Sequence, residues 1–150
     1  QGSHVEAPHG DLRRGQMIFE GRGRCLNCHR INGLGSYAAT DLSDIGIIRS
    51  SDYLERSLVD PAASDLPEHR LIRAVTSDGT VITGRHLNED TFTVQLIDSK
   101  GNLISLLKPQ LKAYEVVKGA AMPSYRGRLS PGELEDLVRY LYSLKGPVAR

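Results

Sequence analysis

The stretch Cys25-Leu26-Asn27-Cys28-His29 decides how this chain is interpreted. Two cysteines separated by two residues can each add a thiol to one vinyl group of the same porphyrin. The imidazole that follows then lies under the ring, where it can bind the iron. This spacing is typical of covalent c-type haem attachment. The motif therefore predicts one haem c, held by Cys25 and Cys28, with His29 as an axial ligand of the iron.

Two other uses of a cysteine pair fit the sequence less well. A thioredoxin-type redox dithiol lies in a βαβ context, and no such alternation flanks the motif. A structural zinc site needs four ligands, and the chain contains only two cysteines.

The second axial ligand must come from a distant part of the chain. Met122 is the leading candidate, because the small residues of its loop let backbone pass close to a ring and a Met/His pair raises the haem potential. Alternatively, Met122 fills a gap in the core. His69 and His86 are rival ligands for which surface positions are expected. Met17 is expected to pack on the apolar side of the first helix.

Composition limits the class of protein. The chain has 150 residues, of which 39% are apolar and 25% charged, as in ordinary globular domains. A net charge of +1 argues against a strongly basic nucleic-acid binder. No apolar run approaches the roughly 18 residues that a membrane span needs. Aromatic residues are only 5%, which leaves room for a bound apolar group in the core.

Helical signals occur in the first and last parts of the chain. Asp11 can cap a helix that runs to Glu20, and Ser51 can cap a second helix over residues 51–59. Ser130 and Glu133 form a capping box. It precedes a helix whose apolar face repeats at 3/4 spacing, with Leu134, Leu137, Val138, Leu141 and Leu144.

The apolar pattern between these helices changes to short runs rich in Val, Ile, Thr and Leu. Turn signals separate them, which predicts an antiparallel meander that could curl into a small barrel-like sheet. Gly84 inside the second run predicts a close backbone approach. The expected strands are 71–76, 80–87, 91–97, 102–107 and 111–117.

These patterns divide the chain into one helical domain and one insertion. Residues 1–9 are interpreted as an expression-vector remnant followed by a loose N-terminus. Residues 10–68 and 118–146 form the expected haem domain, residues 69–117 the β insertion, and residues 147–150 a tail.

The helical part resembles the class I cytochrome c family. The resemblance rests on the first and last helices, the segment from Gly21 to His29, the segment Asp41–Gly46 and the Met122-Pro123-Ser124-Tyr125 loop. It implies a mainly α cytochrome c fold, with the methionine of that loop as the sixth iron ligand.

The resemblance also implies that the first and last helices cross beside the haem. Gly15 and Phe19 would then face Leu137, Tyr140 and Leu141. The expected pocket around the haem is lined by Leu34, Thr40, Leu42, Ile45, Tyr53, Leu54, Pro123 and Tyr125.

The chain departs from the family at two places. The family has Gly-Pro before the Asp-Leu segment, and the proline carbonyl accepts a bond from the ligand imidazole. Here Ala39-Thr40 stands there, and the Thr40 carbonyl can do the same work, since the bond uses backbone. The second departure is the insertion, which makes the expected fold α+β overall. With this insertion, the chain resembles the C-terminal haem-binding domain of bacterial membrane-associated or PQQ-type propeller dehydrogenases. The matching stretches are residues 49–61, the Ser77-Asp78-Gly79-Thr80 turn with Thr83-Gly84-Arg85, and Met122-Pro123.

The expected function is single-electron transfer by one haem c, between a dehydrogenase and a downstream acceptor. Protein ligands on both sides of the iron leave no position for a substrate, so the chain is expected to be a carrier and not an enzyme. The dehydrogenase is either a separate partner or part of the same parent chain. The alternatives are a haem-based sensor or weak peroxidase with a displaceable distal ligand, and a haem-free interaction domain. The family implies a bacterial, periplasmic or otherwise extracytoplasmic location.

Basic residues flank both halves of the expected haem site. They are interpreted either as a collar that steers an acidic redox partner or as ordinary solvated charges and propionate partners. The residues are Arg22, Arg24, Arg30, Lys118, Arg126 and Arg128.

Overall fold

The computed structural model describes residues 7–63, 66–117 and 122–146. It has four α-helices, a two-stranded sheet and a five-stranded sheet. The expected vector remnant, the tail at 147–150, and Lys118 with the small residues 119–121 before Met122 lie outside the described residues.

The helices begin and end at local sequence signals. The Asp11 side chain accepts a bond from Arg14 N and caps the first helix, Ser50 and not Ser51 caps the third, and Ser130 and Glu133 form the expected capping box on the fourth. The bounds are α1 Leu12–Glu20, α2 Ile45–Ile48, α3 Ser51–Val59 and α4 Pro131–Tyr142.

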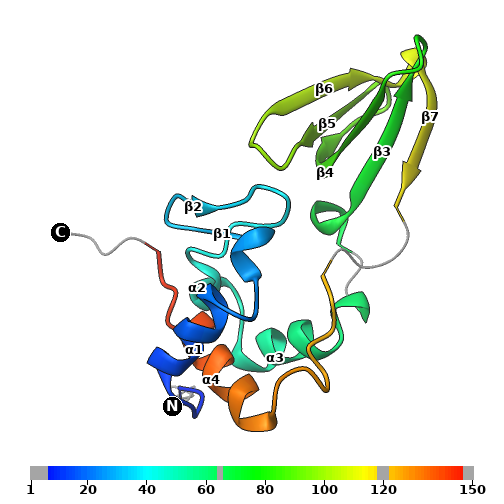
Figure 1. Ribbon diagram of the computed structural model, residues 1–150. Coiled ribbons are helices and arrows are strands. Elements are labelled where there is room, and N and C mark those ends of the chain that lie inside the picture. The colour runs from blue at the N-terminus through cyan, green and yellow to red at the C-terminus, as the bar shows by residue number, and fades with distance from the viewer. Residues whose placement is uncertain (1–6, 64–65, 118–121, 147–150) are drawn as a thin grey trace, which may run out of the picture.

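The crossing of α1 and α4 organises the helical core, as the family resemblance implied (Figure 1). Gly15 lies so close to α4 that a Cβ there would be 1.9 Å from the Asp136 carbonyl oxygen. Phe19 and Tyr140 pack ring to ring, with centroids 5.5 Å apart. Leu137 is fully buried in the same cluster. Only a residue without a side chain permits this backbone approach.

The segment between α1 and α2 contains little regular structure. A 3₁₀ turn, η1 (Cys25–Asn27), leads into a hairpin of β1 (Arg30–Ile31) and β2 (Leu34–Gly35). The hairpin turns at Asn32 and Gly33, both with positive φ (47° and 86°), which is the conformation that Asn-Gly favours in two-residue turns.

The insertion forms a sheet with a core of its own. Ile72, Val94 and Leu96 are buried at its centre, separately from the helical core. The strands are β3 Leu71–Thr76, β4 Val81–Glu89, β5 Thr93–Ile97, β6 Leu103–Leu107 and β7 Leu111–Val116, and the short 3₁₀ turns are η2 Pro61–Ala63, η3 Pro67–His69 and η4 Lys108–Gln110.

The strand order is β6-β5-β4-β3-β7, with every neighbouring pair antiparallel. The expected meander holds from β3 to β6, but β7 pairs with β3 and not with its sequence neighbour β6. The sheet is therefore open, with β6 and β7 at its edges, and the expected barrel-like closure is wrong. Gly84 is confirmed as a close approach, since a Cβ there would be 2.9 Å from the Ile97 carbonyl oxygen.

The sheet stands at one end of the molecule and the helices at the other, as Figure 1 shows. The turn between β5 and β6 reaches back to the helical part: Tyr37 N donates to the Ser99 carbonyl oxygen at 3.3 Å, and the Tyr37 ring lies under Gly101.

The expectation of a mainly α cytochrome c fold is wrong. The structure is α+β, with 34% helix and a five-stranded antiparallel sheet as a second major unit. The physical reason lies in two segments. Residues 71–116 form a sheet around a small core of their own, and residues 21–44 form turns, a short hairpin and a 3₁₀ turn but no α-helix.

Candidate functional site

The cysteine motif forms one tight turn directly after α1. Arg24 enters it in the left-handed conformation, with φ of 53°. The Cys25 carbonyl oxygen then accepts bonds from both Cys28 N at 3.2 Å and His29 N at 2.7 Å. The two cysteines and His29 therefore lie together on one short turn. Cys25 is buried and Cys28 is exposed, and neither forms a disulfide.

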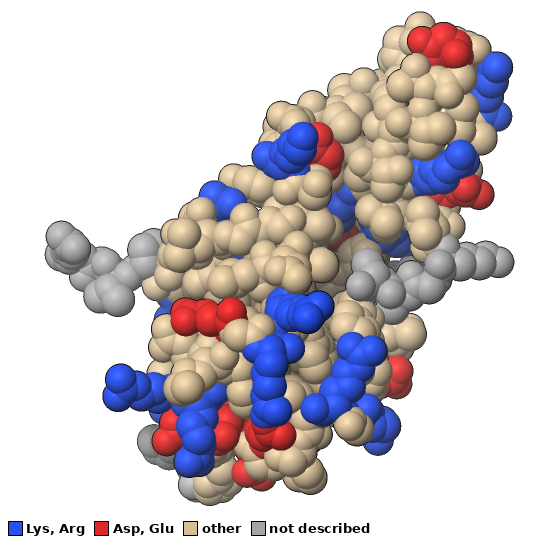
Figure 2. All heavy atoms as spheres, in the orientation of Figure 1, with Lys and Arg blue, Asp and Glu red and all other residues tan. Residues whose placement is uncertain are grey.

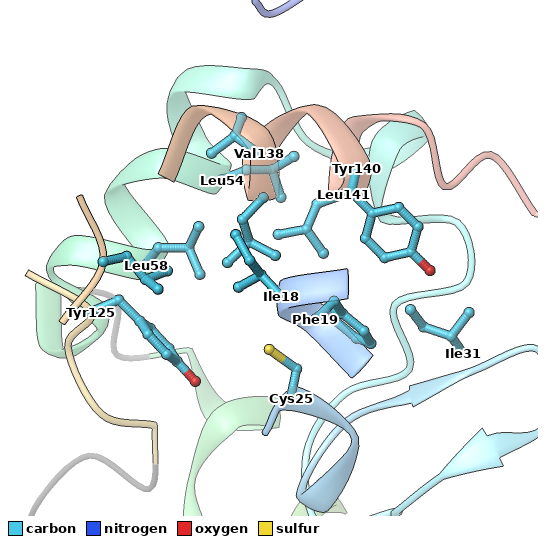
Figure 3. Close-up of a cluster of buried hydrophobic side chains, with 12 residues drawn as sticks. Ile18, Phe19, Cys25, Ile31, Leu54, Leu58, Tyr125, Val138, Tyr140 and Leu141 are labelled. Atoms are coloured by element: carbon cyan, nitrogen blue, oxygen red, sulfur yellow. The ribbon is translucent and has the colours of Figure 1, made fainter. Parts of the chain in front are cut away.

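Cys25 and Tyr125 meet in the helical core. Figure 3 shows the Cys25 sulfur beside Ile18 and Phe19, with the Tyr125 hydroxyl turned toward it. The buried Tyr125 hydroxyl donates to the Gly23 carbonyl oxygen. Burial raises the pKa of Tyr125 to about 12 and also raises the pKa of the Cys25 thiol. Both shifts favour the protonated forms, the phenol and the thiol.

His29 is held by the backbone of Thr40. Its Nδ1 lies 2.8 Å from the Thr40 carbonyl oxygen, as the sequence predicted. A carbonyl oxygen only accepts, so Nδ1 carries the proton and Nε2 carries the lone pair. Burial lowers the pKa of His29, and the positive charges of His69 and Arg85 lower it further, against the opposing effect of the Thr40 bond. A neutral imidazole with a free lone pair on Nε2 is the form that binds a metal ion.

A loop folds back over the motif and fixes it. Ser36 N donates to the His29 carbonyl oxygen at 3.1 Å, and Ala39 N donates to the Cys28 carbonyl oxygen at 2.8 Å. Gly35, with φ of 103°, passes so close that a Cβ would lie 2.2 Å from the His29 carbonyl oxygen. The loop therefore depends on a glycine at this position.

Met122 belongs to a loop that is anchored on α3. Tyr125 N donates to the Leu58 carbonyl oxygen at 2.8 Å, and Ser124 Oγ donates to the Val59 carbonyl oxygen at 2.6 Å. Met122 itself is partly buried against the helical core that contains Cys25. Met17, expected to pack on α1, is instead 68% exposed.

The other expected pocket residues fall into two groups. Leu54 is buried in the helical core, and Leu42 and Ile45 pack against it. Leu34 is 70% exposed and Pro123 is also exposed, while Tyr53 lies under the Arg49 guanidinium at 4.4 Å. Because Leu34 is exposed beside the motif, an apolar ligand bound at His29 would cover its side chain.

The two rival histidines occupy different environments. His69 lies exposed in η3, as expected. His86 is buried in the sheet with its Nε2 3.1 Å from a Glu89 carboxylate oxygen, so the surface position expected for it is wrong. Gly84 and His86 share the face of β4 that packs on the sheet core, because strand residues alternate.

The sequence assigned no role at the site to Arg85, although this residue lies near it in the structure. Its charge acts on the imidazole of His29 from a strand 56 positions later in the chain. A single arginine in a strand carries no local signal of such proximity, so only the fold could reveal it.

The expected basic collar is partly paired in the structure. Arg22 forms an ion pair with Glu133, and Arg30 stacks on the Tyr37 ring at 4.2 Å. Figure 2 shows several Lys and Arg side chains on the face of the helical part that it presents.

Neither a protein-family model nor a curated protein sequence matches this chain. Among the described residues, no group of three or more His, Cys, Asp or Glu side chains is placed to hold a metal ion. No helix in the described ranges is long and apolar enough to cross a membrane. The donors themselves, two thiols and an imidazole on one turn, fit a haem c.

Proposed function

We propose that this chain is a monohaem c-type electron-transfer protein or domain. The single observation that carries the proposal is the Cys25–His29 motif whose imidazole donates Nδ1–H to the Thr40 carbonyl oxygen at 2.8 Å. A bound haem supplies one-electron exchange between Fe(III) and Fe(II), and the protein sets its access and potential.

The residues of the chain have separate roles in holding the group. Cys25 and Cys28 would each hold the haem through a thioether, formed when the thiol S–H adds across one vinyl C=C bond and the hydrogen goes to the adjacent carbon, with no oxidant needed. His29 would offer Nε2 to the iron, since the Thr40 carbonyl oxygen keeps the ring in the required tautomer and orientation. Met122, whose loop is anchored on α3, is the proposed sixth ligand.

Filling both axial positions with side chains favours electron transfer over catalysis, because no position at the iron is left for a substrate. We further propose that the redox partner is a dehydrogenase, separate or in the same parent chain, with a terminal acceptor downstream. Since maturation of such haems in bacteria takes place outside the cytoplasm, the proposed location is periplasmic or extracytoplasmic.

Production in a bacterial host with a c-type haem maturation system tests the proposal. We expect red protein whose intact mass exceeds that of the polypeptide by one haem, and colour that stays with the chain after denaturation. The Cys25→Ala/Cys28→Ala double variant is the matched control and should lose the covalent haem. Colourless wild-type protein with the bare polypeptide mass would contradict the proposal.

A further inference from the structure

Arg85, in strand β4 of the inserted sheet, has a buried hydrogen-bond donor that no described residue pairs with. Its Nε is buried and has no hydrogen-bond partner within the described residues. Its Nη1 reaches only the Glu68 carbonyl oxygen, at a long 3.4 Å. A buried donor without a partner is costly, because it has lost its bonds to water and gained none. Such a group points to a ligand that completes it.

The register of the sheet places Arg85 in the middle of β4, where the start of β3 and the end of β5 meet the strand. Arg85 pairs with Leu71 on one side and Ile97 on the other. Ile97 is followed directly by the β5–β6 turn, whose Ser99 accepts the bond from Tyr37 N. Ser36 joins this turn to the motif, because its Oγ donates to the Ser99 carbonyl oxygen at 3.3 Å and its backbone N donates to the His29 carbonyl oxygen at 3.1 Å. The row that contains Arg85 therefore leads into the turn that contacts the segment around His29.

The charges around this position are mostly positive. Arg49 and His69 lie close enough to interact with each other, and Arg85 interacts with His69 as well. Figure 2 shows Lys or Arg atoms, together with some Asp or Glu atoms, where the sheet meets the helical part.

A bound haem would supply hydrogen-bond acceptors for the Arg85 guanidinium. It carries two propionate carboxylates, and a carboxylate accepts two parallel bonds from the fork of an arginine. Nε and one terminal nitrogen form one side of that fork, and Nε is the buried unpartnered atom of Arg85. We propose that Arg85 binds a propionate of the haem, so that the inserted sheet is part of the haem site. This inference rests on the proposed function.

Arg85 would act as a positioning residue that also sets the potential. An arginine that neutralises a propionate removes negative charge near the iron, and negative charge favours Fe(III). Loss of Arg85 should thus lower the reduction potential. The insertion would then contribute to redox tuning, in addition to any role as a docking surface.

The test compares Arg85→Gln with Arg73→Gln in the haem-loaded protein. Arg73 lies on the same face of the sheet, two rows from Arg85, and pairs with Glu115 at 3.4 Å. At a fixed potential, the Fe(III)/Fe(II) ratio of Arg85→Gln should be about tenfold higher than that of the wild type. This corresponds to a reduction potential that is ~59 mV lower for a one-electron couple, which redox titration measures. Arg73→Gln should match the wild type. The propionate bending band in the resonance Raman spectrum should move in Arg85→Gln alone.

The outcomes separate the two proposals. If all three proteins carry covalent haem but Arg85→Gln has the potential and Raman band of Arg73→Gln, the propionate contact is wrong and the proposed function stands. If none carries covalent haem, the proposed function itself fails. Should Arg85→Gln not accumulate, Arg85→Lys replaces it, because lysine keeps the charge and loses the fork. A smaller shift in the same direction is expected there, and an unchanged Raman band would overturn the inference.

Discussion

His29 Nδ1 and the Thr40 carbonyl oxygen lie 2.8 Å apart across 11 positions of the chain. The loop between them is closed by the β1–β2 turn at Asn32-Gly33 and by Gly35, which lies against the His29 backbone. The acceptor is a backbone atom, so the orientation of the ligand imidazole depends on the path of this loop and not on the side chain at position 40.

Replacement of Thr40 tests that dependence. We expect Thr40→Ala to leave the reduction potential of the haem protein unchanged and to alter the free energy of unfolding by less than about 0.5 kcal/mol, as for substitutions away from key contacts. Redox titration and urea unfolding measure the two quantities. A clear change of potential in Thr40→Ala would show that the threonine hydroxyl, and not only the backbone, acts on His29.

Met122 and Met17 are the only methionines of the chain, which offers a matched pair of variants. Met122→Ala should remove the sulfur ligand, lower the potential by the equivalent of about tenfold or more in the Fe(III)/Fe(II) ratio, and let carbon monoxide bind the ferrous haem. Met17→Ala, at an exposed position, should change neither property. Wild-type protein that already binds carbon monoxide readily, and a Met122→Ala variant identical to it, would favour the sensor or peroxidase alternative.

The local signals in the sequence predicted most elements, because each depends on residues close together in the chain. The capping box at Ser130 and the turn signals between the strands are of this kind, and the structure has helices and strands at those places. The hairpin at Asn32-Gly33 has a strong turn signal, since Asn-Gly favours two-residue turns, but the sequence analysis predicted no strands beside it. Its strands, of two residues each, are too short to show an alternating pattern.

Non-local contacts were the part that the sequence could not predict. The pairing of β7 with β3 depends on which edge is free once β3 to β6 have formed. No residue of Leu111–Val116 indicates which strand it will pair with. For the same reason His86 was expected on the surface, since its burial follows from the sheet face it shares with Gly84. At the candidate site, the motif was found from its spacing and Thr40 from the resemblance to the cytochrome c family. Arg85 was not found, because its relation to His29 exists only in the fold.

The α1–α4 crossing should tolerate no side chain at Gly15. A Cβ would collide with the Asp136 carbonyl oxygen and with Tyr140 Cβ, at 1.9 and 2.8 Å, and backbone cannot move aside without separating the helices. We expect Gly15→Ala to lower the free energy of unfolding by about 3 kcal/mol, at the upper end of typical overpacking costs. Urea unfolding measures it.

Gly132 provides the control for that substitution. It lies in the first turn of α4, and a Cβ there would meet nothing within 4 Å. Gly132→Ala should be neutral or stabilise by up to about 1 kcal/mol, because alanine favours the helix and restricts the unfolded chain. Equal destabilisation by both substitutions would contradict the close packing of the two helices.

Asp136 ties α4 to the start of α1 and makes the stability of the helical core depend on pH. Its carboxylate accepts bonds from Asp11 N at 2.7 Å and from Arg14 Nε at 3.0 Å. The Asp11 backbone bond, followed by the Arg14 bond and charge, lowers the pKa of Asp136 in the folded protein. The folded protein therefore holds this proton less tightly than the unfolded chain. The stabilisation is fully present above the unfolded pKa of about 3.9 and is lost as the pH falls through the lower folded value.

We expect Asp136→Asn to cost about 1–3 kcal/mol at pH 7, the usual range for bonds to a charged group, and to cost progressively less as the pH falls below about 4. Glu135→Gln, at the exposed neighbouring position on the same helix, should stay within about 0.5 kcal/mol of the wild type at pH 7. Urea unfolding of the three proteins at pH 7 and at several values below 4 measures the difference. A cost of Asp136→Asn that does not diminish toward acidic pH would mean that the charge of the carboxylate is not what holds the two helices together.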